Sequence, residues 1–267
     1  MPRRRAEPHP GETFALGLLQ GPAELLPVSS SAHVELLPWL LGWRHARLDG
    51  ARRKEVAVAL HAGTLAALAA ARGPRALARP WLGVAAALPP SVTGLALEAQ
   101  IERRWSGPRA IACGLLAGSA ALIVAEAAPA RRAAADATLT DAFWLGAAQA
   151  AALVPGVSRS AATRAAARAR GFTAAAAAEL SAEAALPVLA GATALKAVRL
   201  LGRRPPPTAR AALAAGALAA GASTAAALRL ERAATLPAWG WAAYRTALAA
   251  VVLAREVRPR AARQWPR

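Results

Sequence analysis

The sequence is poor in cysteine and in acidic residues. It contains one cysteine, so no disulfide can form within it. Cys113 lies inside an apolar stretch, where we expect a small packing residue and not a reactive thiol. Acidic residues are also scarce, with 15 Asp and Glu against 33 Lys and Arg, which gives a net charge of +18. Such a chain suits an anionic partner, either a nucleic acid or a membrane surface.

Apolar residues, in contrast, are abundant at 56% of the chain, and their placement favours the membrane. The cations form short clusters, and the uncharged stretches between them approach the roughly 20 residues that a spanning helix needs. A nucleic-acid-binding protein would place its arginines along one helix face, so we expect no nucleic-acid partner. A basic soluble nucleic-acid-binding protein is the weaker alternative. The uncharged stretches are 56–71, 80–97, 110–125, 142–158 and 211–228.

Prolines lie inside several apolar segments. Proline removes a helical hydrogen bond and clashes with the preceding turn, so we expect interruptions at Pro27, Pro89–Pro90, Pro155 and Pro187. The carbonyls freed at such breaks need partners in protein or water. Short, broken apolar segments in corresponding positions predict an internal repeat with a binding site between its halves.

A direct comparison of the two halves indicates this repeat. Residues 16–31, LGLLQGPAELLPVSSS, align without a gap with residues 145–160, LGAAQAAALVPGVSRS. We predict one integral membrane domain, 1–267, with repeat halves at about 12–128 and 141–256. Each half would begin with a hairpin whose first arm is too short to span. The predicted fold is an all-α polytopic membrane protein with an inverted-topology repeat, in which two re-entrant helical hairpins meet at mid-membrane.

Serines follow the proline of each hairpin and begin the next helix. Serine caps the free N–H groups at a helix start, and these groups also bind phosphate. Arg159 lies between two of the serines, and its guanidinium matches phosphate oxygens. Simple capping for the serines, and an interfacial position for Arg159, are the alternatives. The candidate phosphate-binding residues are Ser29, Ser31, Ser158, Arg159 and Ser160.

The first hairpin also carries ionisable groups. Gln20 and Glu24 are four residues apart, on one face if the arm is helical. A charged group in a membrane segment is costly, which makes Glu24 a candidate functional residue. His33 lies just past the turn, where its imidazole could approach Glu24 for acid–base chemistry. His45 and His61 have no comparable context.

These motifs resemble the signatures of the undecaprenyl-diphosphate phosphatases, the bacitracin-resistance type of membrane phosphatase. The first signature is similar to LGLLQGPAELLPVSSSAH and the second to PGVSRSAAT. The resemblance continues, in order, through ALHAGTLAAL, LPPSVTGLALE, DAFWLGAAQ, AAELSAEAALPVLAGATAL and LPAWGWAAYRTALAAVV. It therefore extends over nearly the whole chain.

The resemblance implies removal of the terminal phosphate of undecaprenyl diphosphate, which recycles the lipid carrier of cell-wall synthesis. It implies a multi-pass protein of the bacterial plasma membrane with an active site open to the outer face. A divalent cation, Mg²⁺ or Ca²⁺, would be bound at Glu24 and Gln20. The catalytic residues implied are Glu24, His33, Ser30 and Arg159, with Glu24 and His33 as the acid–base pair. The nucleophile stays open between Ser30, His33 and water.

The sequence departs from the family pattern at several positions. Gln20 replaces a common Glu, and Ala32 and Ala161 stand where Gly is frequent. Four charged residues occupy unusual places: Arg164, Arg168, Arg170 and Glu183. Besides polyprenyl diphosphate and bilayer lipids, a second copy of the chain is a possible partner. The alternative function is a polyprenyl-phosphate transporter, or flippase, which would need the arginine and helix ends but no general base.

Overall fold

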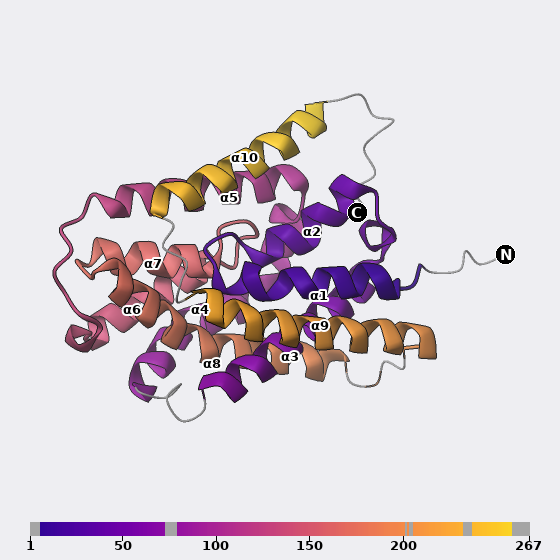
Figure 1. The fold of residues 1–267 in the computed structure, drawn as a ribbon, viewed down its shortest axis with the longest axis horizontal. Coiled ribbons are helices and arrows are strands. Elements are labelled where there is room, and N and C mark those ends of the chain that lie inside the picture. The colour runs from indigo at the N-terminus through magenta and orange to yellow at the C-terminus, as the bar shows by residue number, and fades with distance from the viewer. Residues whose placement is uncertain (1–5, 73–78, 201, 203–204, 232–236, 258–267) are drawn as a thin grey trace.

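The computed structural model describes residues 6–72, 79–200, 202, 205–231 and 237–257, so both ends of the predicted domain 1–267 lie outside the described residues. Within these ranges the chain forms ten α-helices and two short 3₁₀ helices, and its strand pairing is limited to one isolated bridge between Arg132 and Phe172. Figure 1 shows their arrangement. The helices are α1 (Pro10–Leu25), α2 (Ser30–Leu41), η1 (Arg44–Arg47), α3 (Gly50–Arg72), α4 (Pro80–Trp105), α5 (Pro108–Glu126), η3 (Ala134–Asp136), α6 (Leu139–Ala151), α7 (Arg159–Ala169), α8 (Ala174–Leu200), α9 (Pro207–Glu231) and α10 (Ala238–Val257).

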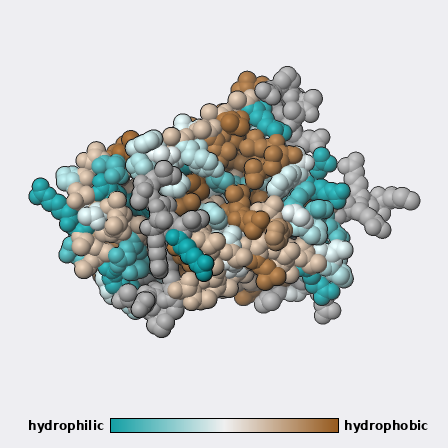
Figure 2. Space-filling model, in the orientation of Figure 1, coloured by the Kyte–Doolittle hydropathy of each residue, from teal (hydrophilic) through white to brown (hydrophobic). Residues whose placement is uncertain are grey.

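Five of these helices, α3, α4, α5, α8 and α9, are long and apolar enough to cross a membrane. On the face in Figure 2, hydrophobic residues gather across the middle and hydrophilic residues at the two ends. Large apolar side chains point outward from α4, where Val84, Leu88, Val92 and Leu95 are each more than 60% exposed. Such a surface is suited to contact with lipid, because an apolar area of this size is unfavourable in water. The prediction of an all-helical, multi-pass membrane protein is confirmed.

The predicted apolar stretches differ from these helices in two places. Stretch 142–158 contains the short helix α6 and a turn, so it does not span, which agrees with the prediction that the first arm of each hairpin is too short. Helix α8 does qualify as a span, although Glu179, Glu183 and Lys196 interrupt its sequence. The charges of these residues are matched: Arg79 pairs with both glutamates, and Lys196 lies 3.8 Å from Glu98. Paired charges cost far less in lipid than isolated ones.

Two of the four predicted proline breaks are found. Pro27 and Pro155 lie in the turns of the hairpins, whereas α4 continues through Pro89–Pro90 and α8 continues through Pro187. The prediction was wrong at these two sites because glycines on neighbouring helices accommodate the rings. A Cβ on Gly83 would lie 2.9 Å from Pro187 Cγ, and one on Gly146 would lie 2.8 Å from Pro89 Cγ. The rings therefore lie against small residues, and both helices continue through them.

Helices α1–α2 and α6–α7 form the two short hairpins. Each first arm packs on a helix of the other half, α1 on α9 and α6 on α4. An acidic residue in the first turn of each arm closes the open end of its hairpin. Glu12 accepts the N–H groups of Arg44 and His45, and Asp141 at the aligned position accepts hydrogen bonds from Arg132 and Arg170. The inverted orientation of the two halves stays a prediction.

Asp141 lies at the end of its hairpin, outside the spanning helices. Burial raises the pKa of its carboxyl, but hydrogen bonds from Arg132, Thr138 and Arg170 outweigh this effect and hold the pKa well below its usual range. The ionised form therefore links α6 to the end of α7.

Elsewhere, α5 packs along α10. Cys113 of α5 is exposed, so the prediction of a packing role was wrong.

The packing of α3 on α9 generates a first prediction. A Cβ on Gly63 would lie 2.0 Å from the carbonyl oxygen of Ala217, so Gly63→Ala must push the two helices apart. Overpacking of this kind costs about 1–3 kcal/mol. We expect a lower midpoint of thermal unfolding in detergent. Gly191→Ala on α8 is the matched control, since no neighbouring helix among the described residues comes within 4 Å of its Cβ position. Equal midpoints for the two variants would contradict this packing.

Candidate active site

The tips of the two hairpins touch each other. Ser160 Oγ donates a hydrogen bond to the carbonyl of Leu26 over 2.8 Å, and Arg159 Nη2 donates to the carbonyl of Glu24 over 3.3 Å. The segments 29–33 and 158–160 are therefore brought to one place, although more than 100 residues separate them along the chain. This juxtaposition is the arrangement on which the predicted site depends.

Both tips have the same local geometry. Ser29 Oγ accepts the N–H of Ala32 at the start of α2, and Ser158 Oγ accepts the N–H of Ala161 at the start of α7. Capping is therefore found at Ser29 and Ser158, whereas Ser30, Ser31 and Ser160 lie within the first turns of α2 and α7. Ser29 and Ser158 have φ values of 77° and 70°, and they are the non-glycine residues with positive φ in the described part of the chain. Left-handed conformations of such residues are strained and cluster at functional sites.

The first N–H groups of α2 and α7 have no carbonyl within their own helix to bind, so both helix starts can receive an anion. Three of the serines, Ser29, Ser158 and Ser160, are buried. Ser30 and the Arg159 guanidinium are partly exposed, and Ser31 is exposed. An incoming anion would reach these three residues first. Phosphate binding by this set stays a prediction.

Glu24, at the end of α1, is buried and contacts both hairpin tips. Its Oε2 accepts a hydrogen bond of 2.6 Å from Ser30 Oγ and one of 3.3 Å from Gln20 Nε2. Its Oε1 accepts one of 3.0 Å from Arg159 Nη2. The predicted proximity of Gln20 and Glu24 is confirmed. The carboxylate links the serine of one tip to the arginine of the other.

His33 has other partners. Its Nδ1 contacts the carbonyl of Ser29 at 2.7 Å and must donate there, because a carbonyl only accepts. Its Nε2 then accepts the hydroxyl of Tyr244 at 2.5 Å, and the two rings stack. The expected contact between His33 and Glu24 is not found in the described part of the chain. Both ring nitrogens of His33 are engaged elsewhere, so its catalytic role stays a prediction.

The imidazole that faces Glu24 is that of His61, which the sequence did not single out. Its Nε2 lies 3.7 Å from Glu24 Oε2, and its Nδ1 contacts the carbonyl of Ala57 at 2.7 Å. A histidine within the apolar stretch 56–71 was a signal that could have been used, since polar groups in spanning helices are costly.

Arg245 of α10 was also missed, and it joins the two tips. Its side chain is fully buried. Its guanidinium donates to the carbonyl of Pro27 in the first tip and to those of Gly156 and Val157 in the second. Further bonds reach Ser119 Oγ and the carbonyl of Leu115 on α5. Arg245 therefore holds both turns through its planar guanidinium, whose five N–H donors lysine cannot reproduce.

The residues that depart from the family pattern have partners here. Arg164 donates to the carbonyl of Leu25, next to Glu24. Arg168 pairs with Glu126, and Arg170 with Asp141. Ala32 and Ala161 are fully buried and supply the capped N–H groups described above, so their methyl groups fit where glycine is frequent.

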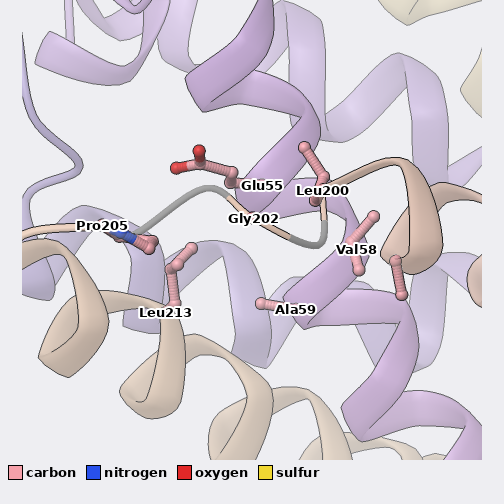
Figure 3. A pocket seen from close by; sticks show the side chains of 8 residues that line it. Glu55, Val58, Ala59, Leu200, Gly202, Pro205 and Leu213 are labelled. Atoms are coloured by element: carbon pink, nitrogen blue, oxygen red, sulfur yellow. The ribbon is translucent and has the colours of Figure 1, made fainter.

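A cavity of about 310 Å³ lies apart from the tips (Figure 3). It is lined by Glu55, Val58 and Ala59 of α3, Leu200 of α8 and Leu213 of α9. None of its lining residues belongs to the hairpins, so the chemistry of the site does not take place there.

The clamp formed by Arg245 generates a second prediction. Arg245→Met would leave carbonyls of both tips buried without donors, which costs about 1–3 kcal/mol for each such group. We expect a loss of at least about 3 kcal/mol in unfolding free energy, measured by denaturation in detergent. Arg255→Met on the same helix is the control, because Arg255 donates to one carbonyl, that of Leu40, and should cost about 1 kcal/mol. Equal losses would show that Arg245 is not a clamp.

Comparison with known proteins agrees with this architecture. Residues 13–251 match the model of the family described as bacitracin resistance protein BacA. The undecaprenyl-diphosphatase of Pelotomaculum thermopropionicum is 35% identical over 201 residues, which are 69% of this chain and 74% of that protein. That of Geobacter metallireducens is 36% identical over 214 residues, 72% of this chain and 77% of that protein. The chain belongs to the BacA family of bacitracin resistance proteins.

Proposed function

We propose that the protein is a membrane phosphatase that hydrolyses undecaprenyl diphosphate to the monophosphate and inorganic phosphate. One observation carries the proposal: Glu24 contacts Ser30 of one helix start and Arg159 of the other. Relatives bearing the name undecaprenyl-diphosphatase support the substrate. The polyprenyl tail would stay in lipid, while the diphosphate lies between the starts of α2 and α7.

Substrate binding would begin with the exposed groups. The phosphate oxygens would draw Arg159 away from Glu24 and accept hydrogen bonds from the first N–H groups of both helices. Ser31, Ser158 and Ser160 would hold these helix starts in place. As charge develops on the phosphoryl oxygens, the guanidinium and the amide groups would stabilise it, which is the main form of catalysis in phosphoryl transfer.

Ser30 is the proposed nucleophile. Its hydroxyl already donates to Glu24 at 2.6 Å, so the carboxylate can accept its proton as Oγ bonds to the terminal phosphorus. The bond between that phosphorus and the bridging oxygen breaks, and the lipid monophosphate leaves. Water then cleaves the phosphoserine, and Glu24 returns the proton to Ser30. The partners of His33 support a different role from that of general base: it holds the carbonyl of Ser29 and thereby the tip.

A divalent cation fits the residues around Glu24. Gln20 is fully buried, and its Oε1 has no hydrogen-bond partner in the described part of the chain. A carboxylate with an adjacent amide oxygen is a donor set for Mg²⁺ or Ca²⁺, the ions that the resemblance implies. When bound, the cation would neutralise part of the phosphoryl charge.

Two further parts of the proposal concern the setting. The site would open to the outer face of the bacterial plasma membrane, and two copies of the chain could associate. A transporter that moves the lipid phosphate without cleaving it needs no serine hydroxyl bonded to a carboxylate. The contact between Ser30 and Glu24 favours hydrolysis over that alternative.

Ser30→Ala tests the chemistry directly. Without the nucleophile, phosphate release from undecaprenyl diphosphate by purified protein with Mg²⁺ should fall about 10³-fold or more. Ser91→Ala on α4 is the control, because Ser91 is exposed and lies outside both hairpins. It should keep turnover within about threefold. Full activity of Ser30→Ala would remove Ser30 from the mechanism. Lipid movement without phosphate release from wild-type protein would favour the transporter.

Arg159→Lys tests the guanidinium. Lysine keeps the positive charge but loses the planar fork that binds two phosphate oxygens. We expect kcat/KM for undecaprenyl diphosphate to fall about 100-fold, equivalent to about 2.7 kcal/mol of transition-state stabilisation. Arg164→Lys, five residues further along α7, should lose less than tenfold, because Arg164 contacts a backbone carbonyl. Comparable losses in both variants would argue against a specific phosphate contact by Arg159.

A further inference from the structure

His61 has the tautomer of a metal ligand. Its Nδ1 lies 2.7 Å from the carbonyl of Ala57 one turn back on α3, and it must donate there. In the neutral form of the ring, the lone pair of Nε2 would face Glu24 Oε2, which lies 3.7 Å away. Metal-binding histidines commonly donate their other ring N–H to a backbone carbonyl in this way. His33 differs, because the hydroxyl of Tyr244 occupies its Nε2.

The separation of Nε2 from the carboxylate suits a shared ion. Two ligand atoms bound to one cation at about 2.1 Å lie roughly 3–4 Å apart, depending on the angle between the bonds. The 3.7 Å contact lies in this range and is too long for a hydrogen bond. Gln20 brings a third donor, since its amide already contacts Glu24 Oε2 and its buried Oε1 has no partner in the described ranges. A half-turn of the amide exchanges its two terminal atoms.

We propose that Gln20, Glu24 and His61 form a mixed oxygen and nitrogen site that binds a divalent first-row transition cation, with Mn²⁺ preferred over Ca²⁺. The inference rests on the proposed function for the position of the site, and it adds His61 as a ligand. An imidazole nitrogen favours first-row transition ions. Ca²⁺ takes six to eight oxygen ligands, and this cluster offers few of them. The amide Gln20, in place of a common glutamate, lowers the negative charge of the cluster further, which disfavours Ca²⁺.

The partial exposure of His61 completes the argument. Its side chain is 35% exposed, whereas that of Glu24 is 7% exposed, so the site is open on the side of His61. Water and the phosphate oxygens of the substrate would complete the coordination of the ion. Before substrate binds, the carboxylate is held by its bonds to Ser30 and Arg159.

The test is pulsed electron paramagnetic resonance of Mn²⁺ bound to the full-length protein in detergent, without substrate. We expect one tightly bound Mn²⁺ whose spectrum carries the nitrogen coupling of a coordinated imidazole. His61→Gln should abolish the nitrogen coupling and weaken Mn²⁺ binding at least tenfold, while Ca²⁺ binding changes less than threefold. His33→Gln is the matched control and should keep the coupling. A folded His61→Gln variant is verified by its thermal unfolding midpoint.

The outcomes separate this inference from the proposed function. Bound Mn²⁺ without nitrogen coupling in the wild type overturns it, and so does a coupling that survives in His61→Gln. Phosphate release by a protein that binds no Mn²⁺ also overturns it, and leaves the phosphatase proposal standing. Nitrogen-coordinated Mn²⁺ in a protein that releases no phosphate supports the cation site and defeats the proposed function.

Discussion

The rest of the site depends on the hydrogen bonds that the buried guanidinium of Arg245 donates to both hairpin turns. Each hairpin ends in a turn whose carbonyls cannot be satisfied by a helix, and in lipid these carbonyls have no water to bind. The Arg245 guanidinium donates hydrogen bonds to the carbonyl of Pro27 in one turn and to those of Gly156 and Val157 in the other. Because one planar group bonds to both turns, it fixes their separation as well as their hydrogen bonding. The starts of α2 and α7 are consequently held toward the same small volume.

Glu24 gives this volume its chemistry. The second half of the repeat has Leu153 at the position aligned with Glu24, so the two hairpins are alike in backbone and different in side chains. One hairpin supplies a carboxylate and a serine, and the other supplies an arginine at the position aligned with that serine. The symmetric element is the pair of capped, strained helix starts. An asymmetric reaction, with one phosphate leaving and one remaining on the lipid, suits a site of this kind.

Much of this site could be predicted because its residues stand out locally. Proline, glutamine and serine are unusual in an alanine-rich apolar segment, and the repeat presents them twice, so Ser29, Ser158 and Arg159 were identified from the sequence. The partners of these residues could not be predicted. Arg245 and His61 act through contacts with residues far away in the chain, and a single arginine or histidine in an apolar helix does not reveal its partner. The uninterrupted course of α4 through Pro89 depended on a glycine of α6, which is likewise a tertiary effect.

The most direct test of the account is an experimental structure of the protein in a lipid nanodisc with a methylene-bridged analogue of undecaprenyl diphosphate, which cannot be hydrolysed. The account predicts one phosphonate group in contact with the first N–H groups of both α2 and α7, with the Arg159 guanidinium moved from Glu24 to its oxygens. Ser30 Oγ would lie in line with the bridging carbon. An analogue bound at one helix start alone, or at a distance from both, would contradict the claim that the two clamped tips form a single site.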